Sequence, residues 1–390
     1  MRILTSPSEL DIHNKIIDLK NKAGSHSPSI QTLKTISSDL EIKVDGCFLS
    51  NPYATDLFMS HLNNDVIGNK IFREYLEYYP SQNREIAANL SKVINVNENN
   101  ILIGNGATEL IESICNNLIK ESCLITLPTF SPYYEFLSSE VERIFYIANE
   151  DDNFEINVYD YLTLAKKKRP KSVVIINPNN PTGFYFTKSE INLILDELKF
   201  CENIILDESF IHFAYEDNDL DMVDYYGLIE KYPNLIIVKS MSKDFGVAGI
   251  RIGYAVMPEK RVNAFLESGY LWNSNGIAEY FIDLYTRDGF RDEYEVERKR
   301  YIRDTQIFYK ELTNIEGISC YQSKANFFLV NLGSEIKSEL LCNIMLIRDG
   351  VYTRNCDDKI GLEGNFLRIA SRSDHENSLI AESLNGILNN

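Results

Sequence analysis

The residues best suited to chemistry lie in one stretch of the chain, between positions 240 and 251. Ser240 and Ser242 carry hydroxyls, Lys243 follows directly with an amine, and Arg251 adds a guanidinium eight residues later. Two hydroxyls and two cations suit a phosphate dianion, and an amine beside a bound aldehyde can form a Schiff base. The stretch therefore predicts that Lys243 forms a Schiff base with pyridoxal phosphate, against the alternative of an ordinary strand-loop-strand with surface polar residues.

Continuous apolar runs must position this stretch. The run from Leu235 to Val238 precedes it, and similar runs begin at Ser172 and Asn203, with helical periodicity between them at 188–200. This alternation indicates a parallel sheet that is buried on both faces. Ligands bind at the carboxyl ends of the strands in such sheets, and the residues that fall there are Asn180, Asp207 and Lys243.

Two further segments follow apolar runs and could complete a cofactor site. A short apolar run begins at Ile101, and Gly106, Ala107 and Thr108 follow it at the start of a predicted helix. The free N–H groups at the start of that helix can hold a phosphate. Any strand-turn-helix needs a glycine, so an ordinary turn is the alternative. Phe130 follows the run from Cys123, where it can stack on a planar ring or serve as a core aromatic.

Composition bounds the remaining possibilities. A chain of 390 residues suits two domains. The net charge of −18, with no basic stripe to offset it, argues against nucleic-acid binding. Seven scattered cysteines without a Cys-x-x-Cys pair indicate reduced thiols in a cytoplasmic protein, with neither a disulfide framework nor a metal site. No apolar run is long enough to span a membrane, and no signal peptide is expected.

Five motifs, taken together, carry a family resemblance. They are Gly104-Asn-Gly-Ala-Thr-Glu109, Asn177-Pro-Asn-Asn-Pro-Thr-Gly183, Leu206-Asp-Glu-Ser-Phe210, Ser240-Met-Ser-Lys243 and Gly249-Ile-Arg-Ile-Gly253. In this order they resemble the motifs of fold-type I pyridoxal-phosphate enzymes of the class I/II aminotransferase superfamily. They are most similar to the branch of histidinol-phosphate aminotransferases and threonine-phosphate decarboxylases, and within it to decarboxylases of amino-acid O-phosphates.

The resemblance implies a role for each motif residue. Lys243 forms the Schiff base and moves protons at the substrate carbon, and Asp207 pairs with the protonated pyridine nitrogen, so that the ring can accept an electron pair. Asn180 donates to the phenolic oxygen, and Phe130 stacks on the ring. The resemblance assigns the cofactor phosphate to the turn before the predicted helix and to polar residues near Lys243, with Tyr53 reaching it across a dimer interface. These residues are Gly106, Ala107, Thr108, Ser240, Ser242 and Arg251.

The carboxy-terminal segment adds three arginines that the family uses for acidic substrate groups. Arg368 matches the arginine that binds the substrate carboxylate, which leaves Arg354 and Arg372 for a second anion such as a phosphate ester. Solvated surface arginines are the alternative, above all for Arg372. In an otherwise acidic chain, such a cluster indicates a dianionic substrate.

One departure bears on the reaction. Phe210 stands where histidinol-phosphate aminotransferases usually have a tyrosine, and the run around it is more similar to that of threonine-phosphate decarboxylases. We therefore expect decarboxylation of an O-phospho amino acid, with O-phospho-L-serine ahead of O-phospho-L-threonine. The alternative is an aminotransferase of the histidinol-phosphate type. A regulatory protein that keeps the fold without catalysis is disfavoured, because Lys243 is present and no basic helix-turn-helix domain is added.

The resemblance also implies the architecture. We expect a large α/β domain from about residue 47 to 278 with a mainly parallel seven-stranded sheet. A smaller α+β domain is expected to combine residues 1–46, as an irregular or helical arm, with residues 279–390. A long, charged helical pattern from about Gly276 through Ile307 resembles a connecting helix that leads into the carboxy-terminal domain. Active sites shared between two subunits imply a homodimer.

Overall fold

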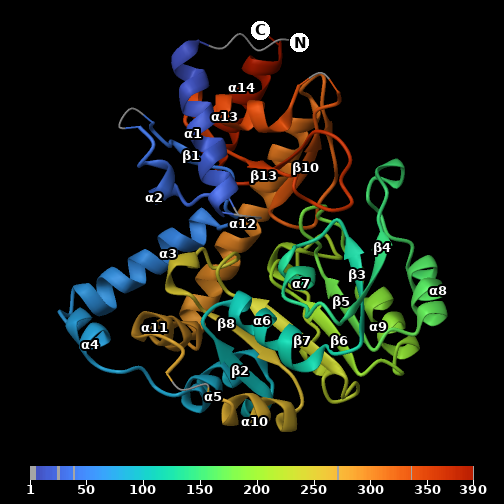
Figure 1. Cartoon of the computed structure of the whole chain (residues 1–390). Helices are drawn as coiled ribbons and strands as arrows, with labels where there is room; N and C mark the ends of the chain where they lie inside the picture. The colour runs from blue at the N-terminus through green and yellow to red at the C-terminus, as the bar shows by residue number, and fades with distance from the viewer. Residues whose placement is uncertain (1–5, 24–26, 38–39, 270–271, 335, 390) are drawn as a thin grey trace. The chain divides into compact units, whose positions relative to one another are not determined.

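The computed structural model describes residues 6–23, 27–37, 40–269, 272–334 and 336–389. The chain divides into two compact units (Figure 1). The larger unit contains Ser50–Asn180 and Phe184–Arg300, and the smaller contains Met1–Leu49, Pro181–Gly183 and Tyr301–Asn390. Parts of the expected amino-terminal arm, at 1–5, 24–26 and 38–39, lie outside the described residues.

A seven-stranded sheet forms the centre of the larger unit. Its strand order is β2-β8-β7-β6-β5-β3-β4, and only β8 runs antiparallel to its neighbours among these strands. The expected mainly parallel sheet is therefore confirmed. The strands are β2 (Ile101–Gly104), β3 (Ser122–Leu127), β4 (Glu142–Ile147), β5 (Ser172–Ile176), β6 (Asn203–Asp207), β7 (Leu235–Ser240) and β8 (Gly253–Val256).

Helices cover this sheet. Helix α6 (Ala107–Leu118) packs on β7 and β8, and α8 (Val158–Lys168) packs on β4 and on α9 (Lys188–Glu197), as Figure 1 shows. The other α-helices of this unit are α3 (Pro52–Leu62), α4 (Phe72–Glu77), α5 (Asn83–Ile94), α7 (Pro132–Glu135), α10 (Glu259–Glu267), α11 (Gly276–Tyr285) and the first part of α12 (Asp288–Thr313).

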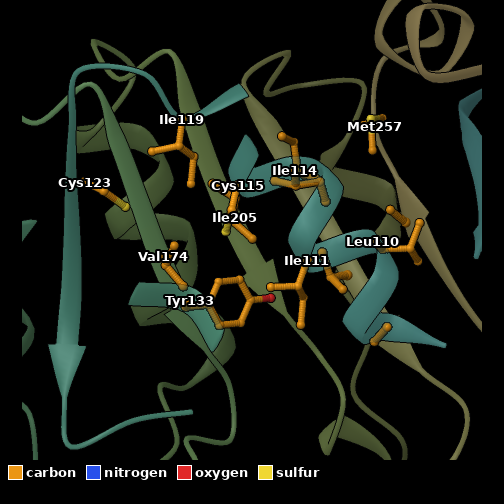
Figure 2. Close-up of a cluster of buried hydrophobic side chains, with 14 of the residues drawn as sticks. Leu110, Ile111, Ile114, Cys115, Ile119, Cys123, Tyr133, Val174, Ile205 and Met257 are labelled. Atoms are coloured by element: carbon orange, nitrogen blue, oxygen red, sulfur yellow. The ribbon is translucent and has the colours of Figure 1, made fainter. Parts of the chain in front are cut away.

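The core of the larger unit lies between α6 and one face of the sheet. Helical periodicity places Leu110, Ile111 and Ile114 on one side of α6, where they are buried against strand residues such as Val174 and Ile205 (Figure 2). Burial of one such side chain contributes about 1.5–3 kcal/mol. This packing fixes the amino terminus of α6 relative to the strand ends.

The predicted connecting helix is interrupted, so that expectation was wrong in this detail. Helix α11 ends at Tyr285 and α12 begins at Asp288. The Arg291 guanidinium donates to the carbonyls of Tyr285 and Thr286, which satisfies the carbonyl groups that the break exposes. Because α11 packs on α5, with Asn89 Nδ2 donating to Asp283 at 2.7 Å, the larger unit extends to Arg300, beyond the boundary expected at residue 278.

The smaller unit is an α+β unit, as expected. Its antiparallel sheet has the order β12-β13-β10-β9, and β1 pairs in parallel with β11. These strands are β1 (Val44–Asp45), β9 (Ser319–Cys320), β10 (Phe327–Asn331), β11 (Val351–Tyr352), β12 (Arg354–Asn355) and β13 (Phe366–Ala370). Its helices are α1 (Pro7–Ala23), α2 (Ile30–Leu33), α13 (Ser338–Asp349), α14 (Asp374–Asn389) and the second part of α12.

Candidate active site

Strand register brings two distant motifs together at one edge of the larger sheet. Gly253 of β8 lies opposite Gly104 of β2 on one side and opposite Ser240 of β7 on the other. A Cβ added to Gly253 would lie 2.7 Å from the Ala107 nitrogen and 2.9 Å from the Lys239 carbonyl oxygen. Only glycine permits this approach, so it places the amino terminus of α6 beside the Ser240 end of β7.

The turn before α6 and Arg251 form a cradle of N–H donors. Gly106 has a φ of +81°, and a Cβ there would lie 2.4 Å from an Arg251 guanidinium nitrogen. Ser242 Oγ is buried and has no hydrogen-bond partner among the described residues. Thr108 is exposed on the first turn of α6, and Ala107 is buried. Backbone N–H groups, a guanidinium and an unpaired hydroxyl suit an incoming phosphate.

Asp207 ends β6 as a buried carboxyl with two donors. Tyr133 OH donates to its Oδ2 at 2.8 Å, and the Ser209 backbone N–H donates to its Oδ1 at 2.8 Å. Burial raises the pKa of Asp207, while these hydrogen bonds oppose the rise. A protonated ring nitrogen would be a close positive partner for this buried carboxyl. Sequence reasoning missed Tyr133, whose only signal is its position one helical turn after Phe130.

The loops after β3 and β5 are hydrogen-bonded to each other. Asn179 accepts from Thr129 Oγ1 at 3.0 Å and donates to the Pro128 carbonyl at 3.0 Å. This double contact joins the loop that carries Phe130 to the loop that carries Asn180. Phe130 packs partly buried against the core, and Asn180 is buried. Both therefore lie at the strand-end edge that also carries Asp207.

Helix α3 anchors the turn that presents Lys243. The Asn51 backbone N–H donates to the Lys243 carbonyl at 2.9 Å, and its side chain caps α3. The Lys243 side chain is half-buried. Tyr53, on the first turn of α3, lies with its ring 4.2 Å from the Arg300 guanidinium carbon. The structure therefore places Tyr53 within the same unit as Lys243, and its role toward a second subunit stays a prediction.

The smaller unit brings two of the three predicted arginines together. Arg354 of β12 and Arg368 of β13 are direct cross-strand partners. Like charges in this position repel each other unless anions are present. Asp358 meets Arg354 Nη2 with both oxygens, at 2.7 and 2.9 Å, and Arg368 Nη2 donates to the Cys47 carbonyl at 2.8 Å. An anion bound beside Arg354 and Arg368 would reduce the repulsion between the two guanidiniums.

Two neighbouring cations differ in their placement. Arg372 lies beyond the end of β13, where its Nε is 3.6 Å from Glu376 Oε1. Lys359, which sequence reasoning missed, is largely buried with its Nζ 3.8 Å from Asp358. Burial lowers the pKa of Lys359, and the charges of Arg354 and Arg368 act in the same direction. Its only sequence signal is its position five residues after Arg354.

Comparison with known proteins identifies the family. A model described as aminotransferase class I and II matches residues 57–387. The chain belongs to this family. A protein named L-serine phosphate decarboxylase from Campylobacter jejuni is 48% identical over 384 residues, which cover 98% of each chain. A second protein of that name, from Sulfurospirillum multivorans, is 43% identical over 95% of this chain and 94% of its own.

A solved structure agrees with the family assignment. The structure of a decarboxylase from Sulfurospirillum multivorans superimposes with a TM-score of 0.94 at 41% identity, over 98% of this chain and 97% of that one. The fold is therefore that of fold-type I pyridoxal-phosphate enzymes, and the chain is such an enzyme with pyridoxal 5′-phosphate as its cofactor. The phosphate cradle and the buried Asp207 carboxyl fit this group.

The described residues contain neither a candidate membrane span nor a candidate metal cluster. No helix in the described ranges is both long and apolar enough to cross a lipid bilayer. Within the same ranges, no group of three or more His, Cys, Asp or Glu side chains is placed to hold a metal ion.

Proposed function

We propose that this enzyme decarboxylates O-phospho-L-serine to ethanolamine phosphate and CO₂, with O-phospho-L-threonine as a poorer substrate that yields aminopropanol phosphate. The observation that carries the proposal is the identity of 48% and 43%, over nearly the whole chain, to two proteins named L-serine phosphate decarboxylase. The cross-strand pair of Arg354 and Arg368 supports it, because this pair suits a substrate with more than one anionic group.

The residues at the strand ends have distinct tasks in this proposal. Pyridoxal phosphate, when bound, accepts the electron pair that is left when a bond at the substrate α-carbon breaks. Asp207 holds a proton at the ring nitrogen, supported by Tyr133 and by the Ser209 N–H. Asn180 donates to the ring's phenolic oxygen. Lys243 Nζ returns one proton to the α-carbon after CO₂ leaves, which gives the product amine.

The arginines decide which bond breaks. Only a bond held perpendicular to the ring can pass its electrons into the conjugated system. We propose that Arg354 and Arg368 bind the substrate's anionic groups so that the α-carboxylate takes this position. Arg372 is proposed as a further contact to the phosphate ester. The second candidate function, transamination, would require the α-hydrogen to take the perpendicular position instead.

The proposed function has a direct test. Purified enzyme is incubated with O-phospho-L-serine and no 2-oxo acid, and the products are followed by phosphorus NMR. Continuing formation of ethanolamine phosphate supports the decarboxylase. A single conversion of the cofactor to pyridoxamine phosphate, with further turnover only after a 2-oxo acid is added, would show an aminotransferase. A Lys243→Ala variant is expected to lose the visible absorbance of the attached cofactor.

We also propose a homodimer. Five large apolar side chains are exposed near α4 of the larger unit, which is typical of an interaction surface: Phe72, Leu76, Tyr78, Tyr79 and Trp272. The Tyr79 and Trp272 rings lie 5.2 Å apart, so that this surface is continuous there. A second copy on this surface would agree with the expected reach of Tyr53 into a partner's site. A fully active monomer in sedimentation would contradict both points.

A cytoplasmic location is proposed from the state of the cysteines. All seven are free thiols in the structure, and six of them are buried. Burial raises the pKa of Cys115 and of Cys201 to about 12, which makes these thiols unreactive. Thiols of this kind are typical of proteins in a reducing compartment.

A further inference from the structure

Several ionisable side chains are buried behind the candidate cofactor site. Lys239, Asp244 and Arg298 are 0% exposed, and His212 is 5% exposed. Lys239 directly precedes Ser240, and Asp244 directly follows Lys243. None of the tasks described above uses these charges, although their burial is costly without a compensating partner.

The contacts join them into one network. Lys239 Nζ forms an ion pair with Asp244 Oδ2, and His212 Nδ1 lies 3.1 Å from the same oxygen. The Tyr294 hydroxyl lies 2.9 Å from His212 Nδ1, and Arg298, one turn later on α12, donates to the His212 carbonyl at 2.8 Å. Burial and the charges of Lys239 and Arg298 lower the pKa of His212 well below its usual value, so its imidazole is neutral.

The network lies on the sheet face opposite to the cofactor residues. Side chains alternate along a strand, so Lys239 points away from Val238 and Ser240. Val238 is paired with Asp207 and belongs to the core beneath α6. The ion pair between Lys239 and Asp244 therefore joins the two ends of the intervening segment, residues 240–243, on the sheet face opposite to α6.

A second set of contacts holds the same turn from its other end. Asn51 Nδ2 donates to the Asp244 carbonyl at 3.2 Å, and Thr55 Oγ1 donates to the Gly246 carbonyl at 2.8 Å. Gly246 has a φ of +65°, and a Cβ there would lie 2.2 Å from the Asn51 carbonyl oxygen. The turn is tied to α3 in this way, and the ion pair holds the segment that carries Lys243 through a second, separate set of contacts.

We propose that the ion pair of Lys239 and Asp244 is a positioning device, which closes residues 240–243 into one conformation and so sets Ser240, Ser242 and Lys243 for the cofactor. His212, held by Tyr294 and Arg298, orients the Asp244 carboxylate. Water is excluded from the pair, since Lys239 and Asp244 are both fully buried, and the rings of Phe245 and Tyr294 pack 4.3 Å apart beside His212. The proposal rests on the assignment of Lys243 to the cofactor and is independent of phosphoserine as substrate.

The test separates positioning from stability. Three variants are compared: Lys239→Met, Asp244→Asn and the double variant with both changes. Lys171→Met is the matched control, because Lys171 forms an exposed ion pair with Glu202 at 2.8 Å in the same unit. The readouts are the melting temperature, the dissociation constant of pyridoxal phosphate from the full-length chain, and hydrogen exchange of the amides of residues 240–246 in the holoenzyme.

The double variant is decisive, because it leaves no unpaired buried charge and should fold as the wild type does. We expect its melting temperature to recover relative to the single variants. Its cofactor affinity should remain weakened by about tenfold, the size of effect that loss of outer partners has at metal sites. Its 240–246 amides should exchange faster than those of the control. If single variants fail to fold, the double variant alone decides.

A folded double variant that binds pyridoxal phosphate as tightly as the control, with unchanged exchange at 240–246, would overturn the proposal. The ion pair would then serve stability only. Absence of phosphoserine decarboxylation in the wild type would refute the proposed function and leave this test intact, because none of the three readouts depends on that substrate.

Discussion

Replacing Glu208 with glutamine is expected to stabilise the protein, and increasingly so as the pH rises. Glu208 is fully buried directly after Asp207, and neither of its carboxyl oxygens has a hydrogen-bond partner in the described part of the chain. Burial raises its pKa from 4.5 to about 8, with the nearby carboxylates of Asp224 and Asp207 adding to the rise and Lys239 and Lys188 opposing it. Glutamine has a similar shape and does not titrate.

The magnitude follows from proton linkage. Between pH 4.5 and 8 the folded protein keeps a proton at Glu208 that the unfolded chain has lost. Stability from this group is therefore complete below pH 4.5 and is lost as the pH rises toward 8. From pH 5 to pH 8 the loss amounts to about 3 kcal/mol. For a unit of this size, the corresponding difference in melting temperature is about 6 °C.

The assay is a thermal melt of the wild type and the Glu208→Gln variant at pH 5, 6, 7 and 8. The difference in melting temperature between the two should grow steadily in favour of the variant. Glu112→Gln, at an exposed position on α6, serves as the control and should show little change. A difference that stays constant across this pH range, or that shrinks as the pH rises, would refute the reasoning about Glu208.

Three further substitutions test the site. Tyr133→Phe removes a donor to the buried Asp207 carboxyl and should lower the turnover number by about tenfold, with a loss of stability of about 1–3 kcal/mol; an unaltered turnover number would contradict the proposed support of Asp207 by Tyr133. Gly106→Ala should lower the affinity for pyridoxal phosphate by about tenfold, because the new Cβ displaces Arg251. The control Gly289→Ala, whose new Cβ meets open space, should leave this affinity unchanged. Arg368→Lys should raise the KM for O-phospho-L-serine by about tenfold with cofactor affinity unchanged, and an equal KM would contradict a substrate role.

The parts of the fold that sequence predicted are those with a strong local signal. Apolar runs marked β3, β5, β6 and β7, and the rule that ligands bind at carboxyl strand ends placed Asp207 and Lys243 at one edge. The end of α11 at Tyr285 was missed, because the charged periodicity continues through the break. At the break the Arg291 guanidinium donates to the carbonyls of Tyr285 and Thr286, a contact from six and five residues further along the chain that the pattern does not signal.

The parts of the site that sequence could not supply depend on contacts between distant residues. Tyr133 and Asp207 are 74 positions apart, and neither segment predicts the hydrogen bond between them. The sequence marks Lys239 only as a residue at the end of a strand. Its ion pair with Asp244 becomes apparent only in the structure. Lys359 was missed because a single lysine in an acidic, polar loop normally faces solvent.

The most direct test of the central claim uses O-phospho-L-serine labelled with ¹³C at the carboxyl carbon, in D₂O and without any 2-oxo acid. We predict continuing release of ¹³CO₂, with many turnovers for each bound cofactor. The ethanolamine phosphate formed should carry one deuterium on the carbon bonded to nitrogen, where Lys243 delivers the proton. Retention of the label in a 2-oxo acid, with at most one turnover and accumulation of pyridoxamine phosphate, would contradict decarboxylation as the function of this enzyme.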